Sequence, residues 1–551
     1  MADAAATLRS KQAGSYRRKP RMHLAYKWQA ALITAFGLFM AVLDNTIVNV
    51  ALQYMRRDFN TDQSTIVWVV TGYFLSQAAI IPAVGYLSDR IGTKTVFLAA
   101  LALFTVGSGL CALAPNEAIL ITCRVIQGLG GGALFPLAFA ITFRVFPPQE
   151  RGPASAVIGV PVLLAPVFGP TIGGLLTKYF DWRAIFTVNL PLGIIVFVLA
   201  LVFLRSHAQE VALGDELAAN QQKGFDVIGL TLAILGTVAL VFGINEAGSY
   251  DLSDLRVWPF ALAGAVLLLG FVLYELRNTD PVMDVRLFRN YSFAIANVLT
   301  WALSAFLFGS LFLLPIFFEN VQGRDALNTG LLLGVQGLAA IVGVILAGRL
   351  YNVLGPRPLI ATGLALVTVA TIGFINLSPS TDPTTLQAWL LVRGLGLGMA
   401  NIPLQTLALA TISNRAMGRA SSLVNVTRQI FSAIGISALT AYLTHQTTNH
   451  AASVTQTFQA SHLAAVQAQC AAQFGNNPAA IGACVQDAAK AYVTANAVTM
   501  GLNDTFLLVM IGTGVGVVLA LFAGRDPNVQ KLKDAAKRGE TVEARTVVVG
   551  E

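Results

Sequence analysis

Charged residues are scarce in this sequence, and their scarcity excludes an ordinary soluble protein. Asp, Glu, Lys and Arg make up 12% of its 551 residues, whereas soluble domains contain about 25%. Hydrophobic residues make up 55%, and the mean hydropathy is +0.67. Apolar runs of about 18 residues or more recur from end to end, and in lipid only helices or closed barrels satisfy the backbone. The composition therefore predicts an all-α polytopic membrane protein.

Histidine and cysteine are also rare, with five and four residues. His445, His450 and His462 show no zinc-ligand spacing. The sequence also has no Walker A phosphate-binding loop and no nucleophilic triad pattern. We therefore expect no metal, no cofactor and no enzymatic activity. The net charge of +8 comes from basic residues near the predicted membrane edges, so no nucleic-acid partner is expected.

Fourteen helical spans account for the apolar runs. Most of the 36 Lys and Arg residues fall in the two tails and in alternate connections, which predicts cytoplasmic termini and an even number of spans. The first apolar run is too long for a signal sequence, so we expect no cleavable signal. The predicted spans lie near residues 28–52, 65–87, 95–114, 118–141, 153–177, 184–204, 225–246, 257–276, 292–318, 329–348, 358–377, 385–411, 420–443 and 501–523.

The chain also contains an internal repeat. Residues 85–94, after the second predicted span, and residues 348–357, after the tenth, share Gly, Leu, Gly and a final basic residue. Such duplication is typical of transporters, whose substrate sites lie between the two halves near mid-membrane. The predicted organisation is a cytoplasmic basic tail (1–27), a six-helix bundle (28–204), a cytoplasmic linker (205–224), two inserted helices (225–276), a second linker (277–291), a second six-helix bundle (292–523) and a cytoplasmic tail (524–551).

Asp44 is the acidic residue that lies well inside a predicted span. A charged side chain at mid-bilayer costs at least about 2.5–3.5 kcal/mol, so it should face the bundle interior or a wet cavity. Asn45, Thr46 and Asn49 follow it, which repeats polar groups along the same helix. We interpret Asp44 as part of a transport pathway, and a structural carboxylate paired with a neighbour is the alternative.

Five segments, in order, resemble the major facilitator superfamily, and within it the fourteen-helix drug:proton antiporters of EmrB/QacA type. Residues 43–52 resemble the helix-one motif of that branch, and residues 181–193 resemble the segment that opens span six. The resemblance to motifs A, B and C lies in residues 85–94, 124–130 and 169–174, with Thr93 where motif A commonly has a basic residue. The resemblance covers nearly the whole chain.

The resemblance implies a major facilitator fold and a multidrug efflux pump linked to antibiotic resistance. Such a pump would export hydrophobic or amphipathic small molecules by alternating access, exchange them for protons without a cofactor, and reside in the bacterial cytoplasmic (inner) membrane. Export of one endogenous lipid, siderophore or metabolite on the same fold stays open, as does a non-transporting membrane sensor.

Site residues follow from the same motifs. Proton coupling is assigned to Asp44 and Arg124, although Arg124 could have a purely structural partner. The conformational latch comprises Gly85, Asp89, Arg90, Gly92 and Lys94, with a solvated loop as the alternative. The antiporter helix motif comprises Gly159, Pro166, Gly169, Pro170, Gly173 and Gly174, which packing alone could also explain. The candidate substrate cavity comprises Asn45, Thr46, Asn49, Gln127, Phe135, Trp301, Gln336, Asn401, Gln405 and Arg428, and ordinary packing is the alternative.

One predicted outer connection, residues 444–500, is far longer than the others. Its Ala-rich stretches predict helices near 458–473 and 478–496, joined by a turn at 474–478. Cys470 and Cys484 flank that turn and would form a disulfide in an oxidising compartment, with two free thiols as the alternative. The resemblance implies partners here, namely a periplasmic adaptor protein and an outer-membrane channel. The alternative is a hairpin that binds no partner and only caps its own helix bundle.

Overall fold

The computed structural model describes residues 25–61, 63–147, 150–205, 226–247, 254–278, 281–324, 326–413, 416–475, 477–524, 526 and 529–530. This part of the chain is helical and contains no strand. The helices are α2 (Tyr26–Asp58), α3 (Gln63–Ile91), α4 (Thr93–Ala112), α5 (Glu117–Val145), α6 (Arg151–Tyr179), α7 (Ala184–Thr187), α8 (Asn189–Phe203), α10 (Val227–Glu246), α11 (Trp258–Glu275), η3 (Val285–Arg289), α12 (Tyr291–Ile316), η4 (Phe317–Val321), α13 (Ala326–Leu354), α14 (Pro356–Thr371), η5 (Ile372–Phe374), α15 (Pro383–Ala410), α16 (Met417–Ser461), α17 (Leu463–Phe474) and α18 (Pro478–Ala520).

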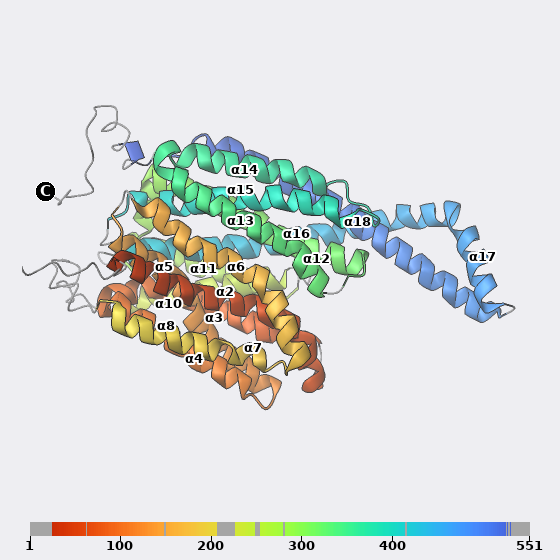
Figure 1. The fold of residues 1–551 in the computed structure, drawn as a ribbon, viewed down its shortest axis with the longest axis horizontal. Coiled ribbons are helices and arrows are strands. Elements are labelled where there is room, and N and C mark those ends of the chain that lie inside the picture. The colour runs from red at the N-terminus through yellow and green to blue at the C-terminus, as the bar shows by residue number, and fades with distance from the viewer. Residues whose placement is uncertain are drawn as a thin grey trace, which may run out of the picture.

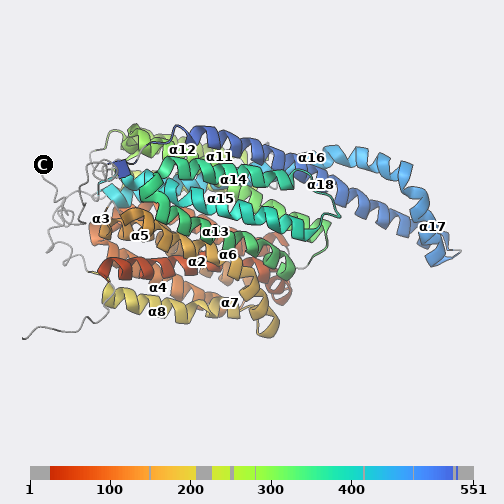
Figure 2. The same cartoon turned by 45° about the horizontal axis from the view of Figure 1, so that its top comes forward.

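Long helices run side by side along the molecule (Figures 1 and 2). Within the described ranges, ten of them are long and apolar enough to cross a membrane, and the apolar stretch Tyr291–Leu307 is a shorter one. The predicted spans coincide in position with helices of the structure. The fold is therefore that of a multi-pass membrane protein, and the count of fourteen spans stays a prediction.

The repeated glycines take the same backbone conformation in both halves. Gly92 precedes α4 and Gly355 precedes α14, with φ of 87° and 88°. A side chain disfavours this left-handed region, whereas glycine adopts it without a steric cost. The repeat seen in the sequence is therefore a pair of tight turns between α3 and α4 and between α13 and α14.

Helices α2–α8 gather on one side of the bundle and α12–α18 on the other (Figure 1). The inserted helix α10 packs against α11 and also against α3 and α16, one helix from each half. A hydrophobic core crosses the boundary between the halves, since Phe139 and Phe143 of α5 belong to one buried cluster with Leu404 of α15 and Leu423 of α16. The halves are thus held together by apolar packing as well as by the polar contacts described below.

The hairpin formed around residues 444–500 differs from its predicted form. Helix α16 continues without a break from Met417 to Ser461, and α18 runs from Pro478 to Ala520, so only α17 is a separate helix at the tip. No Gly or Pro interrupts the sequence between Gly435 and Gly475, which lets the Ala-rich helix extend past the predicted boundary. Cys470 and Cys484 form a disulfide across the tip.

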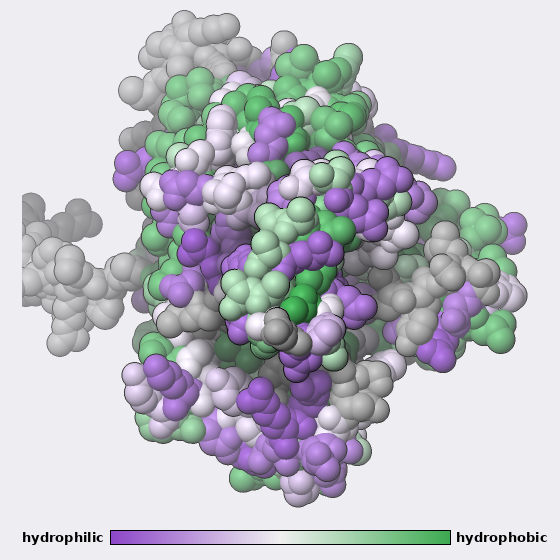
Figure 3. All heavy atoms as spheres, turned by 90° about the vertical axis from the view of Figure 1, so that its right-hand side faces the viewer, coloured by the Kyte–Doolittle hydropathy of each residue, from purple (hydrophilic) through white to green (hydrophobic). Residues whose placement is uncertain are grey.

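The hairpin projects well beyond the other helices (Figures 1 and 2). At about 1.5 Å per residue, α16 is roughly 68 Å long, about twice the thickness of a hydrocarbon core. Figure 3 looks onto this end of the molecule, where hydrophilic side chains gather on the end face and hydrophobic ones on the flanks. The hairpin is thus an outward extension of two bundle helices rather than a separate domain.

Candidate functional site

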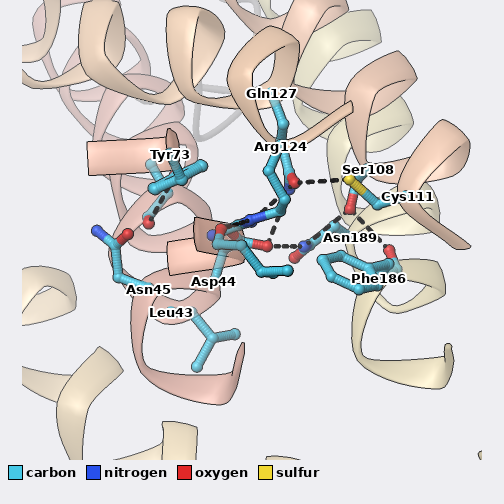
Figure 4. Close-up of polar contacts among 12 residues, drawn as sticks. Leu43, Asp44, Asn45, Tyr73, Ser108, Cys111, Arg124, Gln127, Phe186 and Asn189 are labelled. Carbon is cyan, nitrogen blue, oxygen red and sulfur yellow. Dashed lines mark hydrogen bonds and ion pairs between the residues drawn. The ribbon is translucent and has the colours of Figure 1, made fainter. Parts of the chain in front are cut away.

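Asp44 lies at the centre of a buried polar network inside the first half (Figure 4). Its Oδ2 accepts from Arg124 Nη1 at 2.5 Å, and its Oδ1 accepts from Gln127 Nε2 and from Asn189 Nδ2, both at 2.9 Å. Asp44 and Arg124 are each 1% exposed. Helices α2, α5 and α8 therefore supply a carboxylate, a guanidinium and two amides to one enclosed site.

The guanidinium of Arg124 has further contacts. Its Nε donates to the carbonyl oxygen of Val69 at 3.1 Å, and its Nη1 also donates to Gln127 Oε1 at 2.8 Å. Its Cζ lies 3.8 Å from the ring centroid of Tyr73 and 5.7 Å from that of Phe186. An unpaired guanidinium would be very costly to bury. The carboxylate, the hydrogen bonds and the aromatic faces together stabilise the charge of Arg124.

A second layer of polar groups holds this network in place. Asn189 Nδ2 also donates to Ser108 Oγ at 3.2 Å, and Ser108 Oγ donates to the carbonyl oxygen of Phe186 at 2.9 Å. The thiol of Cys111 lies 3.6 Å from Gln127 Oε1. Asn189 and Ser108 are not among the site residues predicted from the sequence. The position of Asn189 within the resembling segment 181–193 was the available signal.

The polar residues that follow Asp44 point elsewhere. Asn45 points away from the network (Figure 4), and its Oδ1 is buried without a hydrogen-bond partner in the described structure. Thr46 Oγ1 donates to the carbonyl oxygens of Leu43 and Ala165 at 2.9 and 3.3 Å. Asn49 is exposed and bonds to the Asn45 carbonyl at 3.1 Å. Of the four predicted polar residues on α2, Asp44 is therefore the one in the buried network.

Glycines on α6 allow close approach of other helices. A Cβ at Gly169 would lie 1.9 Å from Thr46 Oγ1, and one at Gly159 would lie 2.5 Å from Ile402 Cδ1 of the second half. A Cβ at Gly173 would lie 3.1 Å from the Ile47 carbonyl oxygen, whereas a Cβ at Gly174 would meet open space. The side chains of Pro166 and Pro170 lie outside the described part of the structure. Helix α6 is thus packed tightly between α2 and the second half.

The 85–94 loop region connects the two halves. Asp89 pairs with Arg144 of its own half at 2.6 Å and with Arg419 of the second half at 3.3 Å. Gly85 N donates to Ser422 Oγ at 2.9 Å, and a Cβ at Gly85 would lie 2.6 Å from the Gly418 carbonyl oxygen. These contacts link the opening of α16 to the end of α3.

The described contacts of the other predicted latch residues lie within the first half. Lys94 Nζ donates to the carbonyl oxygens of Leu201 and Leu204 at 2.6 and 2.7 Å. Arg90 Cζ lies 4.8 Å from the ring centroid of Tyr86, and Gly92 forms the turn described above. The predicted latch therefore divides into a pair that touches the second half, Gly85 and Asp89, and a group that anchors the loop.

The predicted cavity residues do not form one cluster. Gln127 belongs to the Asp44 network, Gln405 Nε2 donates to Asn401 Oδ1 at 2.7 Å, and Gln336 is buried with Oε1 unpartnered among the described residues. Three others contact aromatic rings near the boundary of the halves. Arg428 Cζ lies 4.1 Å from the Phe135 ring centroid, and Trp301 stacks on Phe431, three residues along α16 from Arg428.

The Major Facilitator Superfamily profile matches residues 34–436. The chain belongs to the major facilitator superfamily. It is therefore a membrane transporter rather than an enzyme. It is 36% identical over 423 residues to the multidrug resistance protein B homolog of Mycobacterium tuberculosis H37Rv, which covers 76% of each chain. It is 30% identical over 517 residues to the uncharacterized MFS-type transporter YhcA of Bacillus subtilis, covering 92% of this chain and 94% of that one.

Solved structures share the fold of this transporter. The proton:xylose symporter XylE, bound to 6-bromo-6-deoxy-D-glucose, aligns with a TM-score of 0.58 at 12% identity, covering 92% of this chain and 99% of that one. At this identity the likeness concerns the fold alone. The expected major facilitator architecture is therefore confirmed at the level of the superfamily.

Proposed function

We propose that this transporter is a proton-coupled antiporter of the fourteen-helix EmrB/QacA branch, which exports hydrophobic or amphipathic small molecules from bacteria. It spans the cytoplasmic membrane with both termini inside, and the proton gradient drives it without a cofactor. Multidrug resistance names among its relatives support the substrate class. The observation that carries the proposal is the buried Asp44 network in the first half.

Asp44 is the proton carrier in this proposal. Its carboxylate is 1% exposed and is held by three donor side chains from two other helices. If Asp44 becomes protonated, its attraction to Arg124 is lost, and the guanidinium is left buried without a counter-charge. Proton uptake therefore favours a different arrangement of α2 and α5, which is the kind of two-state element that alternating access requires.

The contacts between the halves support a state closed at one end. Arg151 Nη1 donates to the Leu409 carbonyl oxygen at 3.1 Å, Ser155 and Thr406 hydroxyls lie 2.8 Å apart, and Ser421 Oγ donates to the Pro136 carbonyl oxygen at 3.0 Å. These contacts between the halves add to the latch contacts between the end of α3 and the start of α16. With the proposed topology this end is cytoplasmic, so the conformation is closed toward the cytoplasm.

Transport by purified protein in liposomes tests the proposal. An imposed pH gradient should drive uptake of at least one compound from a panel of hydrophobic cations, anions and neutral dyes, and collapse of the gradient should abolish it. Asp44→Asn should remove gradient-driven transport, since Asn keeps the shape and does not titrate in this range. Transport by the Asn variant at the normal rate, with ordinary pH dependence, would exclude Asp44 as the coupling residue.

The hairpin of α16, α17 and α18 is the proposed docking site for a partner. Its length and its tip disulfide support this role, and with the proposed topology it extends toward the outer compartment. We propose that a periplasmic adaptor protein binds it and leads to an outer-membrane channel.

A further inference from the structure

The region around Arg428 has more hydrogen-bond donors than acceptors. Arg428 lies on α16, roughly 17 Å along the helix from Met417, and so about midway through the hydrocarbon layer. One of its nitrogens, Nη2, donates to Asn425 Oδ1 at 3.2 Å. Its Nε is buried without an acceptor, and no described carboxylate forms an ion pair with it.

A second donor, on a ring that stacks against α16, has the same deficit. Trp301 of α12 stacks on Phe431 with ring centroids 4.7 Å apart and planes 2° apart. Phe431 follows Arg428 by three residues, so both lie on one face of α16. The indole Nε1 of Trp301 is also buried without a partner among the described residues. Guanidinium and indole N–H groups only donate, so the missing partner must be an acceptor.

The surroundings are aromatic and belong to both halves. Phe135 of α5 faces the guanidinium at 4.1 Å, and Phe288 lies 5.7 Å from Trp301 between ring centroids. Arg428, Phe135 and Trp301 are half-buried rather than sealed, in contrast to Asp44 and Arg124. A flat apolar molecule would find ring faces here, and its acidic group would find a positive charge and two free donors.

We propose that the Arg428 region binds amphipathic organic anions, that is, aromatic or apolar molecules that carry one acidic group. The acidic oxygen atoms accept from Arg428 and Trp301, and the apolar body lies against Phe135 and Phe431. This inference deepens the proposed export function and depends on it for the step of transport, whereas binding itself needs no gradient. The anion could also be the headgroup of a lipid, and the experiment separates the two sources.

Two probes with the same aromatic skeleton test the proposal. Anilinonaphthalene sulfonate is anionic, and N-phenylnaphthylamine lacks the sulfonate. Binding of each radiolabelled probe is measured with the full-length protein in nanodiscs of zwitterionic lipid. A hydrogen bond to a charged group is worth about 1.5–3 kcal/mol, so Arg428→Gln should weaken sulfonate binding at least about tenfold and leave the amine unchanged.

Matched variants make the result specific. Arg428→Lys should retain part of the sulfonate affinity, and Trp301→Phe, which keeps a ring but loses the donor, should weaken it a few-fold, at about the value of one neutral hydrogen bond. Arg277→Gln removes an exposed positive charge and should change neither probe. If Arg428→Gln does not fold, the Trp301→Phe result decides, since equal affinity for the sulfonate with and without the indole donor would overturn the site.

The remaining outcomes separate this site from the proposed pump. If neither substitution changes sulfonate binding while a pH gradient drives transport of the amine or of a cationic dye, the anion site is wrong and the proposed pump function is supported. If the substitutions weaken sulfonate binding but no probe is driven by the gradient, the anion site stands and the proposed function fails. If adding phosphatidylglycerol to the nanodiscs displaces the sulfonate through Arg428, the occupant is a lipid headgroup, and the substrate assignment is overturned.

Discussion

A buried arginine has different partners in the two halves of this transporter. Arg124 lies on α5 and Arg393 on α15. These two helices correspond, because α5 follows the Gly92 turn and α4, and α15 follows the equivalent Gly355 turn and α14. Both are 1% exposed. Arg124 has a carboxylate, an amide, a carbonyl and an aromatic face. Arg393 donates to Ser310 and lies 5.7 Å from the ring centroid of Phe374, but its Nε and Nη1 lack hydrogen-bond partners among the described residues. The first half thus neutralises its buried charge internally, whereas Arg393 has no counter-charge among the residues that the structure describes.

The difference indicates separate tasks for the two halves. A closed ion pair that one proton can break suits proton coupling, and it needs no contact with the substrate. Unmatched positive charge at Arg393 and Arg428 suits a partner that comes from outside the bundle. We infer that the first half holds the coupling chemistry, and that the second half supplies charge to the substrate side.

Removal of one member of the first-half pair should produce the largest effect. Asp44→Ala leaves Arg124 as an uncompensated buried charge, which costs about 3–5 kcal/mol in comparable cases. Thermal unfolding in detergent should show a strong loss of stability. The double variant Asp44→Ala/Arg124→Met removes both charges and should recover most of it. If the double variant is as unstable as the single one, the ion pair is not what holds this site together.

The equivalent change in the second half should have the opposite sign or none. Arg393→Met replaces a charge that lacks a described counter-ion by an apolar side chain of similar length. Because an unpaired buried charge is costly, its removal should be neutral or stabilising. Thermal unfolding under the same conditions, beside Arg124→Met as the destabilised control, measures the difference. A loss of stability equal to that of Arg124→Met would remove the contrast between the halves.

The latch should give a smaller effect, on turnover rather than on stability. Asp89→Lys replaces attraction to Arg144 and Arg419 by repulsion at the contact between the halves. These pairs are partly exposed, so each contributes at most about 1 kcal/mol to folding. Transport in liposomes should slow while thermal stability changes little, because a latch biases conformers. Arg277→Glu, which reverses an exposed charge outside the latch, is the control, and equal slowing by both would exclude a latch at Asp89.

Some of this arrangement follows from the sequence, for a physical reason. A charged residue in an apolar run is costly, so Asp44 and Arg124 were identifiable one at a time. The repeated glycines were identifiable because their turns require a left-handed backbone. The faces of the helices were not identifiable, since Asn189 looks like any polar residue near the start of a span. Gln127 was assigned to a cavity, and the structure places it on the carboxylate.

The hairpin shows the same limit at larger scale. Composition predicted helices and a turn at residues 474–478, but it did not predict that α16 and α18 extend from the bundle without a break. Helix ends are readable where Gly or Pro stops the helix, and this stretch has neither until Gly475. The loops at the corresponding place in the first half are short, so the hairpin is a further difference between the halves.

Shortening the hairpin should have the smallest effect on the isolated pump. His450 Nε2 lies 2.8 Å from Asp504 Oδ2, and a Cβ at Gly501 would lie 2.7 Å from Thr447 Oγ1, so the base of the hairpin is packed. Replacing residues 455–496 by a short Gly/Ser linker keeps this base and removes the tip with its disulfide. Gradient-driven transport in liposomes should be unchanged if the tip only docks a partner. Adaptor capture and efflux from whole cells should then fail.

A matched variant, Cys470→Ser/Cys484→Ser, keeps the tip and loses its covalent link, and it should reduce adaptor capture less than the deletion does. If the deletion cripples transport in liposomes, the tip is part of the pump and the docking proposal is wrong. If the deletion leaves both liposome transport and whole-cell efflux intact, no partner uses this surface, and the long second-half extension has no role in export.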